Sequence, residues 1–138
     1  MPTALERGER PEISWWWRAA QRDQEMARTL LAAGYSEGAA FHAQQAAEKA
    51  LKALLAAHGN SGRTHASVHL LIALRGAGVD IPAVVDAAAK RLDLHYINAR
   101  YPNGVGGAPE DFYDQALAEE LLAYMETVLT FAAGQLEP

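Results

Sequence analysis

Apolar residues recur every three or four positions along most of the chain, which is the spacing of helices that bury one face. The first such stretch predicts a helix from Ile13 to Ala33, and the next residue, Gly34, is typical of the position just beyond a helix. A second helix should begin at Ser36, a good N-cap, and stop at the sequence His58-Gly59-Asn60.

The remaining pattern predicts three further helices. A short one begins within residues 64–67 and ends before Gly76, and another follows over residues 83–99. Tyr101 precedes Pro102, which disfavours a helical backbone there. The last helix should occupy residues 109–134, because a proline followed by two acidic residues is a favourable helix start.

These elements predict an all-α fold, an up-and-down antiparallel helical bundle of four main helices plus a short extra helix. Alanine and leucine dominate the composition, and the predicted loops are short. One domain should span residues 13–135, after an N-terminal tail of residues 1–12. Trp15, Trp16 and Trp17 are consecutive, and neighbours on a helix point about 100° apart. We therefore expect at least one of them on the surface or in an interface.

Composition and charge narrow the class of protein. The chain has no cysteine, which excludes disulfides and thiolate metal clusters and fits a reducing cytoplasm. No apolar run has the length of a membrane span, so we expect a cytoplasmic protein without a membrane partner. The net charge is −5, and all 12 Lys and Arg lie at or before Arg100. A polyanion site would have to be a local patch in the first hundred residues.

Three stretches occur in a characteristic order, namely "AAFHAQQAAEKALKALLAAHG", "RTHASVHLL" and "LDLHYINARYPNG". Together they resemble the stand-alone prokaryotic HEPN domain (higher eukaryote and prokaryote nucleotide-binding), and the resemblance covers Trp16 to Phe131. It implies a helical bundle that is usually homodimeric and often partnered by a minimal nucleotidyltransferase. Many relatives are ribonucleases or toxins of toxin–antitoxin pairs, and the family name reflects an earlier proposal of nucleotide binding.

Catalytically active relatives share an Arg followed, after four to six residues, by a His. The imidazole can move protons at the 2′-hydroxyl and the leaving oxygen of RNA, while the guanidinium holds the phosphate. The resemblance makes Arg100, in the Arg-Tyr-Pro corner, the candidate Arg. The His would fall at residues 105–107, which are Val-Gly-Gly in this chain. The motif therefore lacks its proton-transfer residue.

Other histidines leave alternatives open. His95 precedes Arg100 in the reverse order. One alternative is a ribonuclease that uses Arg100 with His95, or with a His from the other subunit of a dimer. His65 matches the Thr-His of the resemblance, and we interpret it as a capping or packing residue. His65 and His69 have the i,i+4 spacing of a helical metal pair, but the sequence offers no third ligand nearby, so we expect no metal site.

The corner has two interpretations. In the functional one, a small cationic site binds a phosphate and a tyrosine stacks on a base. Its candidate residues are Arg100, His95, Arg91, Lys90, Tyr96, Tyr101 and Asn103. In the structural one, Arg100 ties down the acidic start of the last helix, and Tyr101 packs into the bundle. The acidic residues there are Glu110, Asp111 and Asp114.

The leading hypothesis is a HEPN homodimer that acts with a nucleotidyltransferase partner in a toxin–antitoxin-like pair. It would bind nucleotide or RNA phosphate at Arg100, and we expect no cofactor. The alternatives are a metal-independent ribonuclease that uses Arg100 with a non-standard His, and a purely structural or interaction bundle.

Overall fold

The computed structural model describes residues 10–137, apart from the side chain of Asn103. Its main helices are α2 (Pro11–Ala32), α3 (Ser36–Ala57), α5 (Ala83–Asp93) and α8 (Gln115–Leu136). Shorter elements are α4 (Ser67–Gly76), α6 (His95–Asn98), α7 (Pro102–Val105) and the 3-10 turn η1 (Pro109–Asp111). Residues 10–137 contain no strand, which confirms the expected all-α fold.

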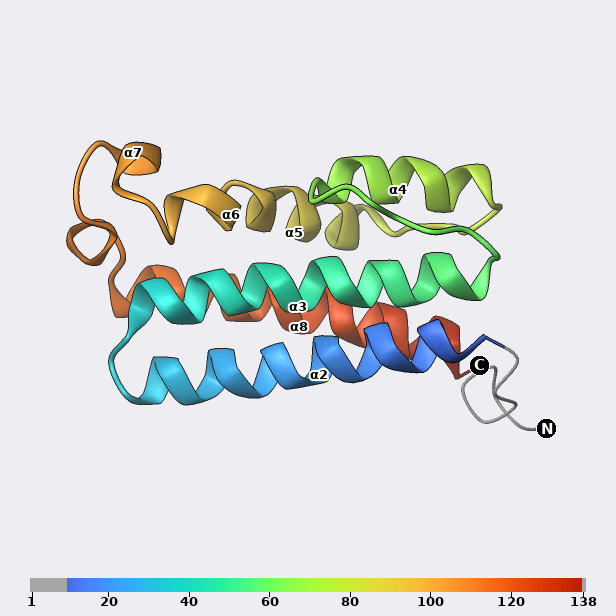
Figure 1. Ribbon diagram of the computed structural model, residues 1–138, viewed down its shortest axis with the longest axis horizontal. Coiled ribbons are helices and arrows are strands. Elements are labelled where there is room, and N and C mark those ends of the chain that lie inside the picture. Colours follow the sequence, from blue (N-terminus) through green and yellow to red (C-terminus); the bar gives the residue numbers. More distant parts are fainter. Residues whose placement is uncertain (1–9, 138) are drawn as a thin grey trace.

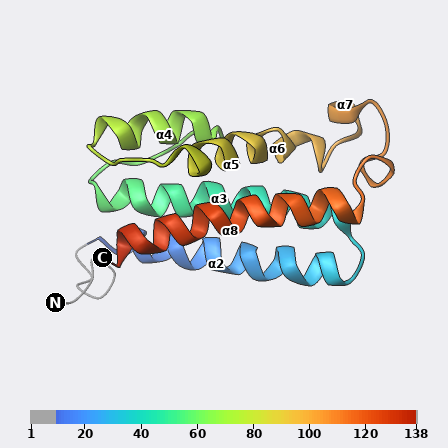
Figure 2. The same cartoon turned by 180° about the vertical axis from the view of Figure 1, so that it is seen from behind.

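The four main helices alternate in direction, as the sequence predicts (Figure 1). Helix α4 is the short extra helix and lies beside α5, and α6 nearly continues the line of α5. Helix α8 packs against α3 and α5, and the reverse view shows it in front of α3 (Figure 2). The α6–α7 corner and η1 gather at one end of the bundle, at the opposite end from the C-terminus (Figure 1).

Helix α3 is buried on nearly every side, because α2, α8 and the row of α4, α5 and α6 all pack against it. Its many alanines allow this close approach of three neighbours. The i,i+4 spacing of Glu48 and Lys52 in the sequence predicts an ion pair on the outer, solvent-facing side of this helix. The pair forms, with 3.0 Å between Nζ and Oε2, but the two residues are only 2% and 5% exposed. A helix at the centre of a bundle has few positions that face solvent.

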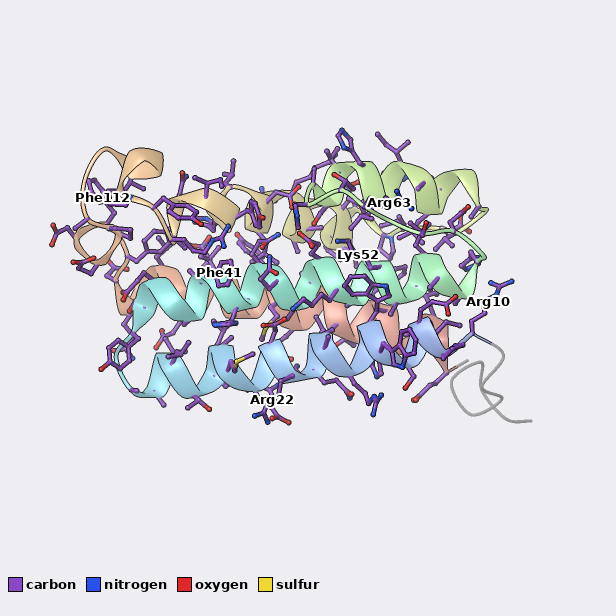
Figure 3. All side chains as sticks on the ribbon, in the orientation of Figure 1. Arg10, Arg22, Phe41, Lys52, Arg63 and Phe112 are labelled. Atoms are coloured by element: carbon purple, nitrogen blue, oxygen red, sulfur yellow. The ribbon has the colours of Figure 1, made fainter. Side chains whose placement is uncertain are left out.

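The first helix begins at Pro11, two residues earlier than predicted, with proline in its favoured first turn. Arg10, from the predicted tail, donates from Nη1 to the carbonyl oxygens of Ala56 and Ala57 at 2.9 and 3.1 Å (Figure 3). These are among the carbonyls that the end of α3 leaves without a helical partner. The rest of the predicted tail, residues 1–9, lies outside the described residues.

The last helix begins later than predicted. Pro109 opens the short turn η1, and α8 begins only at Gln115. Asp114 is its N-cap, with an extended backbone and an Oδ1 that accepts the Leu117 N–H at 2.8 Å. A carboxylate that satisfies a free helical N–H defines the start better than a proline does.

The tryptophans behave as expected. Trp15 is 61% exposed, whereas Trp16 and Trp17 pack partly buried against the core.

Of the helices in residues 10–137, none is long and apolar enough to cross a membrane.

Candidate functional site

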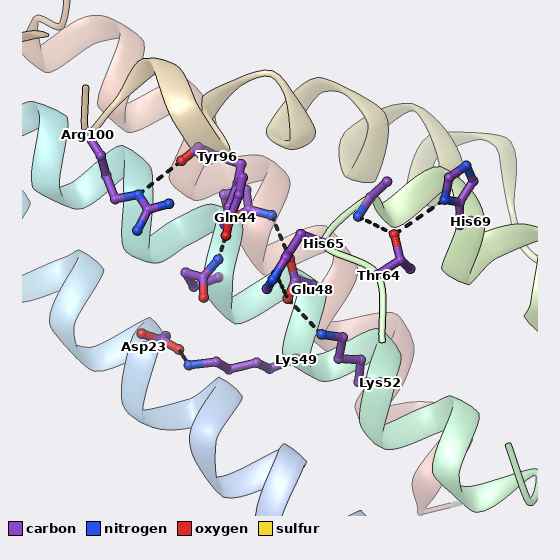
Figure 4. Close-up of polar contacts among 12 residues, drawn as sticks. Asp23, Gln44, Glu48, Lys49, Lys52, Thr64, His65, His69, Tyr96 and Arg100 are labelled. Atoms are coloured by element: carbon purple, nitrogen blue, oxygen red, sulfur yellow. Dashed lines mark hydrogen bonds and ion pairs between the residues drawn. The ribbon is translucent and has the colours of Figure 1, made fainter. Parts of the chain in front are cut away.

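Arg100 follows α6 and holds its guanidinium among three aromatic rings. The Cζ atom lies 4.6, 4.7 and 4.8 Å from the ring centroids of Phe41, Tyr96 and Tyr101. The Nε–H donates to the Tyr96 carbonyl oxygen at 3.2 Å (Figure 4). Such contacts hold a cation without neutralising its charge.

The rings reach Arg100 from different parts of the chain. Tyr96 comes from the preceding turn of α6, and Phe41 comes from the second turn of α3 and points toward the corner (Figure 3). Tyr101 has extended backbone angles of φ −122° and ψ 133°, as predicted for a residue before proline. It is 46% exposed and so does not pack into the bundle.

The structural interpretation of Arg100 named the wrong partners. Among the described residues, Arg100 forms no salt bridge with any carboxylate, including those of Glu110, Asp111 and Asp114. The chain turns through α7 and η1 between Arg100 and α8, and Asp114 is used instead as the N-cap of α8. The guanidinium charge therefore has no counter-ion within this part of the chain.

His65, which sequence reasoning treated as a capping or packing residue, lies next to this corner. Its ring stacks on Tyr96, with centroids 4.8 Å apart and an interplanar angle of 14°. Figure 4 shows Tyr96 between the side chains of Arg100 and His65. His65 does not cap α4, whereas Thr64 Oγ1 accepts the N–H of Ala66 at 3.0 Å.

Glu48 connects His65 to the buried interior. Its Oε2 lies 3.3 Å from His65 Nδ1 and 3.0 Å from Lys52 Nζ, and its Oε1 accepts from Gln44 Nε2 at 3.3 Å. A buried carboxylate needs such partners. His65 remains 57% exposed at its side chain, so one edge of the ring is anchored and the rest is open to solvent. The sequence signal for this contact is the presence of both the "QQAAEK" and the "RTH" motifs in one chain.

An open cavity of about 380 Å³ lies beside His65 and Tyr96. Its other lining residues are Thr64, Ala66, Asp93, Leu94 and Ile97. Asp93 Oδ2 accepts the N–H of Val68, in the first turn of α4, at 3.4 Å. The part of the cavity lined by the Asp93 carboxylate and by Leu94 and Ile97 is poorly suited to a phosphate.

The other predicted cations contact groups away from Arg100. Lys90 Nζ pairs with Asp86 Oδ1 at 2.7 Å, and the Arg91 guanidinium lies over the Tyr124 ring at 5.8 Å. The structure therefore does not gather these two side chains around Arg100. The side chain of Asn103 lies outside the described part of the structure.

His95 contacts Tyr113, in the segment between η1 and α8, rather than Arg100. Its Nδ1 shares a 2.6 Å hydrogen bond with the Tyr113 hydroxyl, and the two rings meet edge to face. Burial lowers the pKa of His95 below the ordinary 6.5, although the Glu120 carboxylate opposes this. Burial also raises the pKa of Tyr113 to about 12. Both partners therefore remain neutral near pH 7.

Within residues 10–137, no group of three or more histidine or carboxylate side chains is placed to hold a metal ion. His69 is directed to Thr64, with 3.3 Å between Nδ1 and Oγ1, rather than to a shared ligand with His65.

Comparison with known proteins defines the class. Residues 13–135 match the family described as the HEPN domain. The crystal structure of TT1696 from Thermus thermophilus is similar, with a TM-score of 0.85 and 36% sequence identity over 90% of this chain and 98% of that one. ST0689, described as an archaeal HEPN homologue, has a TM-score of 0.77 and 36% identity over 91% and 98%. No curated protein matches this chain. The chain belongs to the HEPN domain family.

Proposed function

We propose that this HEPN domain binds the phosphate of a nucleotide or RNA at Arg100, as a homodimer that acts with a nucleotidyltransferase partner in a toxin–antitoxin-like pair in the cytoplasm. The observation that carries the binding site is the Arg100 guanidinium, held by three rings and without a carboxylate partner among the described residues. A guanidinium has five N–H donors, and within the described residues Arg100 uses one of them, in the hydrogen bond to the Tyr96 carbonyl oxygen.

Tyr96 and Tyr101 differ in whether a base can stack on them. Arg100 and His65 lie on opposite sides of Tyr96, so a base has no free face of that ring on which to stack. Tyr101 contacts Arg100 and is half exposed, which makes it the better stacking platform. The ligand would place its phosphate on Arg100 and its base on Tyr101.

The ribonuclease alternative with His95 receives no support from the geometry. Its imidazole is hydrogen-bonded to Tyr113 in a partly buried position, and its pKa is lowered. A general base needs to reach the 2′-hydroxyl proton of a substrate held by Arg100. We therefore propose binding at Arg100 and assign no proton transfer to His95.

The test is a titration of the purified protein with a fluorescent 5′-mononucleotide and with a short single-stranded RNA. Arg100→Ala should weaken both by about tenfold or more, as expected for a lost charge-assisted contact. Arg22→Ala is the matched control, because Arg22 is exposed on α2, far from the corner, and should leave affinity unchanged. Equal affinities of the wild type and Arg100→Ala, or no binding by the wild type, would overturn the site.

The partner is tested separately. We expect a small nucleotidyltransferase to be encoded beside this gene and to co-purify with the chain on co-expression. The partner proposal is wrong if the neighbouring gene is of another kind, or if the two proteins elute separately. The proposed phosphate site at Arg100 would not be affected by either result.

A further inference from the structure

We propose that His65 and Arg100 bind consecutive phosphates of a single-stranded oligonucleotide, whose backbone passes the edge of Tyr96. This inference rests on the proposed phosphate site at Arg100 and extends it to a second contact. The preferred ligand is then a strand with at least two phosphates rather than a mononucleotide.

The first support is the arrangement of the two side chains around one ring. The Arg100 Cζ lies 4.7 Å from the Tyr96 centroid, and the His65 ring lies 4.8 Å from it. Figure 4 shows Tyr96 between them, so one ring separates the guanidinium from the imidazole. A single phosphate cannot contact both groups across that ring. Successive phosphates of a strand are spaced widely enough to do so, with Tyr96 between them.

The second support is the anchoring of His65. Its Nδ1 faces Glu48 Oε2 at 3.3 Å, and Glu48 is buried and is also held by Lys52. With Nδ1–H directed to the carboxylate, Nε2 is left for a ligand. In the protonated ring Nε2–H donates to a phosphate oxygen, while Lys52 already balances the charge of Glu48. The ring is therefore oriented before a ligand arrives, which lowers the entropy cost of binding.

The surroundings limit the length of this track. Beyond His65, the cavity wall carries the Asp93 carboxylate together with the exposed apolar side chains of Leu94 and Ile97. A further phosphate would be repelled there, whereas a base could cover the apolar wall. The chain has net charge −5 and no Lys or Arg after Arg100, which also favours a short strand over a long one.

The experiment compares 5′-UMP with the dinucleotide pUpU, which has two phosphates, in mildly acidic buffer. The wild type should bind pUpU about tenfold more tightly than UMP, as expected for one added charge-assisted contact. His65→Ala should bind UMP as the wild type does and lose the gain for pUpU. For His65→Ala, the slope of the logarithm of the pUpU association constant against the logarithm of the salt concentration should be shallower than that of the wild type by about 0.7. This difference corresponds to the loss of one phosphate contact on a single strand.

His58→Ala is the control, because His58 is an exposed histidine at the end of α3. It should retain the full gain for pUpU. His65→Asn is the second variant, to be used if the alanine variant has a lowered melting temperature. The deoxyuridine dinucleotide, which differs from pUpU only in lacking the 2′-hydroxyls, tests the source of the phosphates: equal binding assigns the track to either nucleic acid, and weaker binding assigns it to RNA.

The outcomes separate the two proposals. If pUpU binds the wild type no better than UMP, or if both His65 variants keep the gain, the second contact is wrong while the Arg100 site stands. If UMP and pUpU both bind Arg100→Ala as tightly as they bind the wild type, the Arg100 site is wrong and this inference fails with it.

Discussion

The His65 ring stacks on the Tyr96 ring at 4.8 Å, and it joins the loop before α4 to helix α6. This contact brings the "RTH" motif against the "HYINARYP" motif, and Arg100 covers the other side of the same tyrosine. Tyr96 is thus the common support of both candidate phosphate contacts. A ring held in this way fixes the positions of both side chains.

Replacement of Tyr96 should therefore affect stability and binding together. Tyr96→Ala removes both ring contacts and should lower the free energy of unfolding by about 1–3 kcal/mol, and it should also weaken pUpU binding. Tyr96→Phe keeps the ring and should stay within about 0.5 kcal/mol of the wild type with unchanged affinity. Urea unfolding and titration measure the two effects. An alanine variant that bound pUpU normally would show that Tyr96 does not support the site.

Asp23 is a buried carboxylate that joins α2 to α3. Its Oδ1 accepts from His42 Nδ1 at 2.8 Å, and its Oδ2 accepts from Lys49 Nζ at 2.6 Å. Burial alone would raise the pKa of Asp23, but the two hydrogen bonds and the Lys49 charge outweigh it and hold the pKa below 3.8. The ionised form therefore stabilises the fold above about pH 4, and this contribution is lost as the pH falls through the lowered pKa.

Asp23→Asn should lower the free energy of unfolding at neutral pH by about 1–3 kcal/mol, because two donors lose their charged acceptor. Its unfolding should also depend less on pH in the acidic range than that of the wild type. Asp80→Asn is the control, since Asp80 is exposed and has no salt bridge among the described residues. Urea titrations of the three proteins at several pH values decide the point. Parallel pH curves for Asp23→Asn and the wild type would contradict the assignment.

His95 should make the protein less stable in weak acid. Burial lowers its pKa in the folded state, so the unfolded chain takes up a proton first as the pH falls through 6.5. Stability is full above that pH and declines below it. His95→Gln should reduce this decline, whereas His58→Gln, at an exposed histidine, should leave it unchanged. Urea unfolding between about pH 5 and pH 8 measures the slopes. An identical slope in His95→Gln would refute the prediction.

Gly104 is required for close packing of the corner. A Cβ at this position would lie 2.9 Å from the Asn98 Cα atom and 2.7 Å from its Oδ1. Gly104→Ala should therefore displace α7 from α6 and lower the free energy of unfolding by about 1–3 kcal/mol. Gly134→Ala in α8 meets nothing within 4 Å and should be neutral or stabilising. Thermal unfolding compares the two variants. A Gly104→Ala protein as stable as the wild type would show that the corner adjusts freely.

Local rules predict much of the fold. Helical periodicity, the Gly34 terminus and the Tyr101-Pro102 break each depend on residues close together in the chain, and the structure has all three. The exposure of Trp15 follows from the angle between neighbouring residues on a helix. The predicted start at Pro109 was wrong, because two helix-start signals lie close together and the Asp114 cap prevails.

The candidate site depended more on tertiary structure. The sequence by itself determined that a cation, Arg100, follows a helix and precedes a break, flanked by aromatic residues. Only tertiary packing decided that His65 and Phe41 join it, that Glu48 and Lys52 are buried, and that Arg91 and His95 contact Tyr124 and Tyr113 instead. The physical reason is range: helix periodicity and capping act within a few residues, whereas burial and pairing depend on which helix faces which.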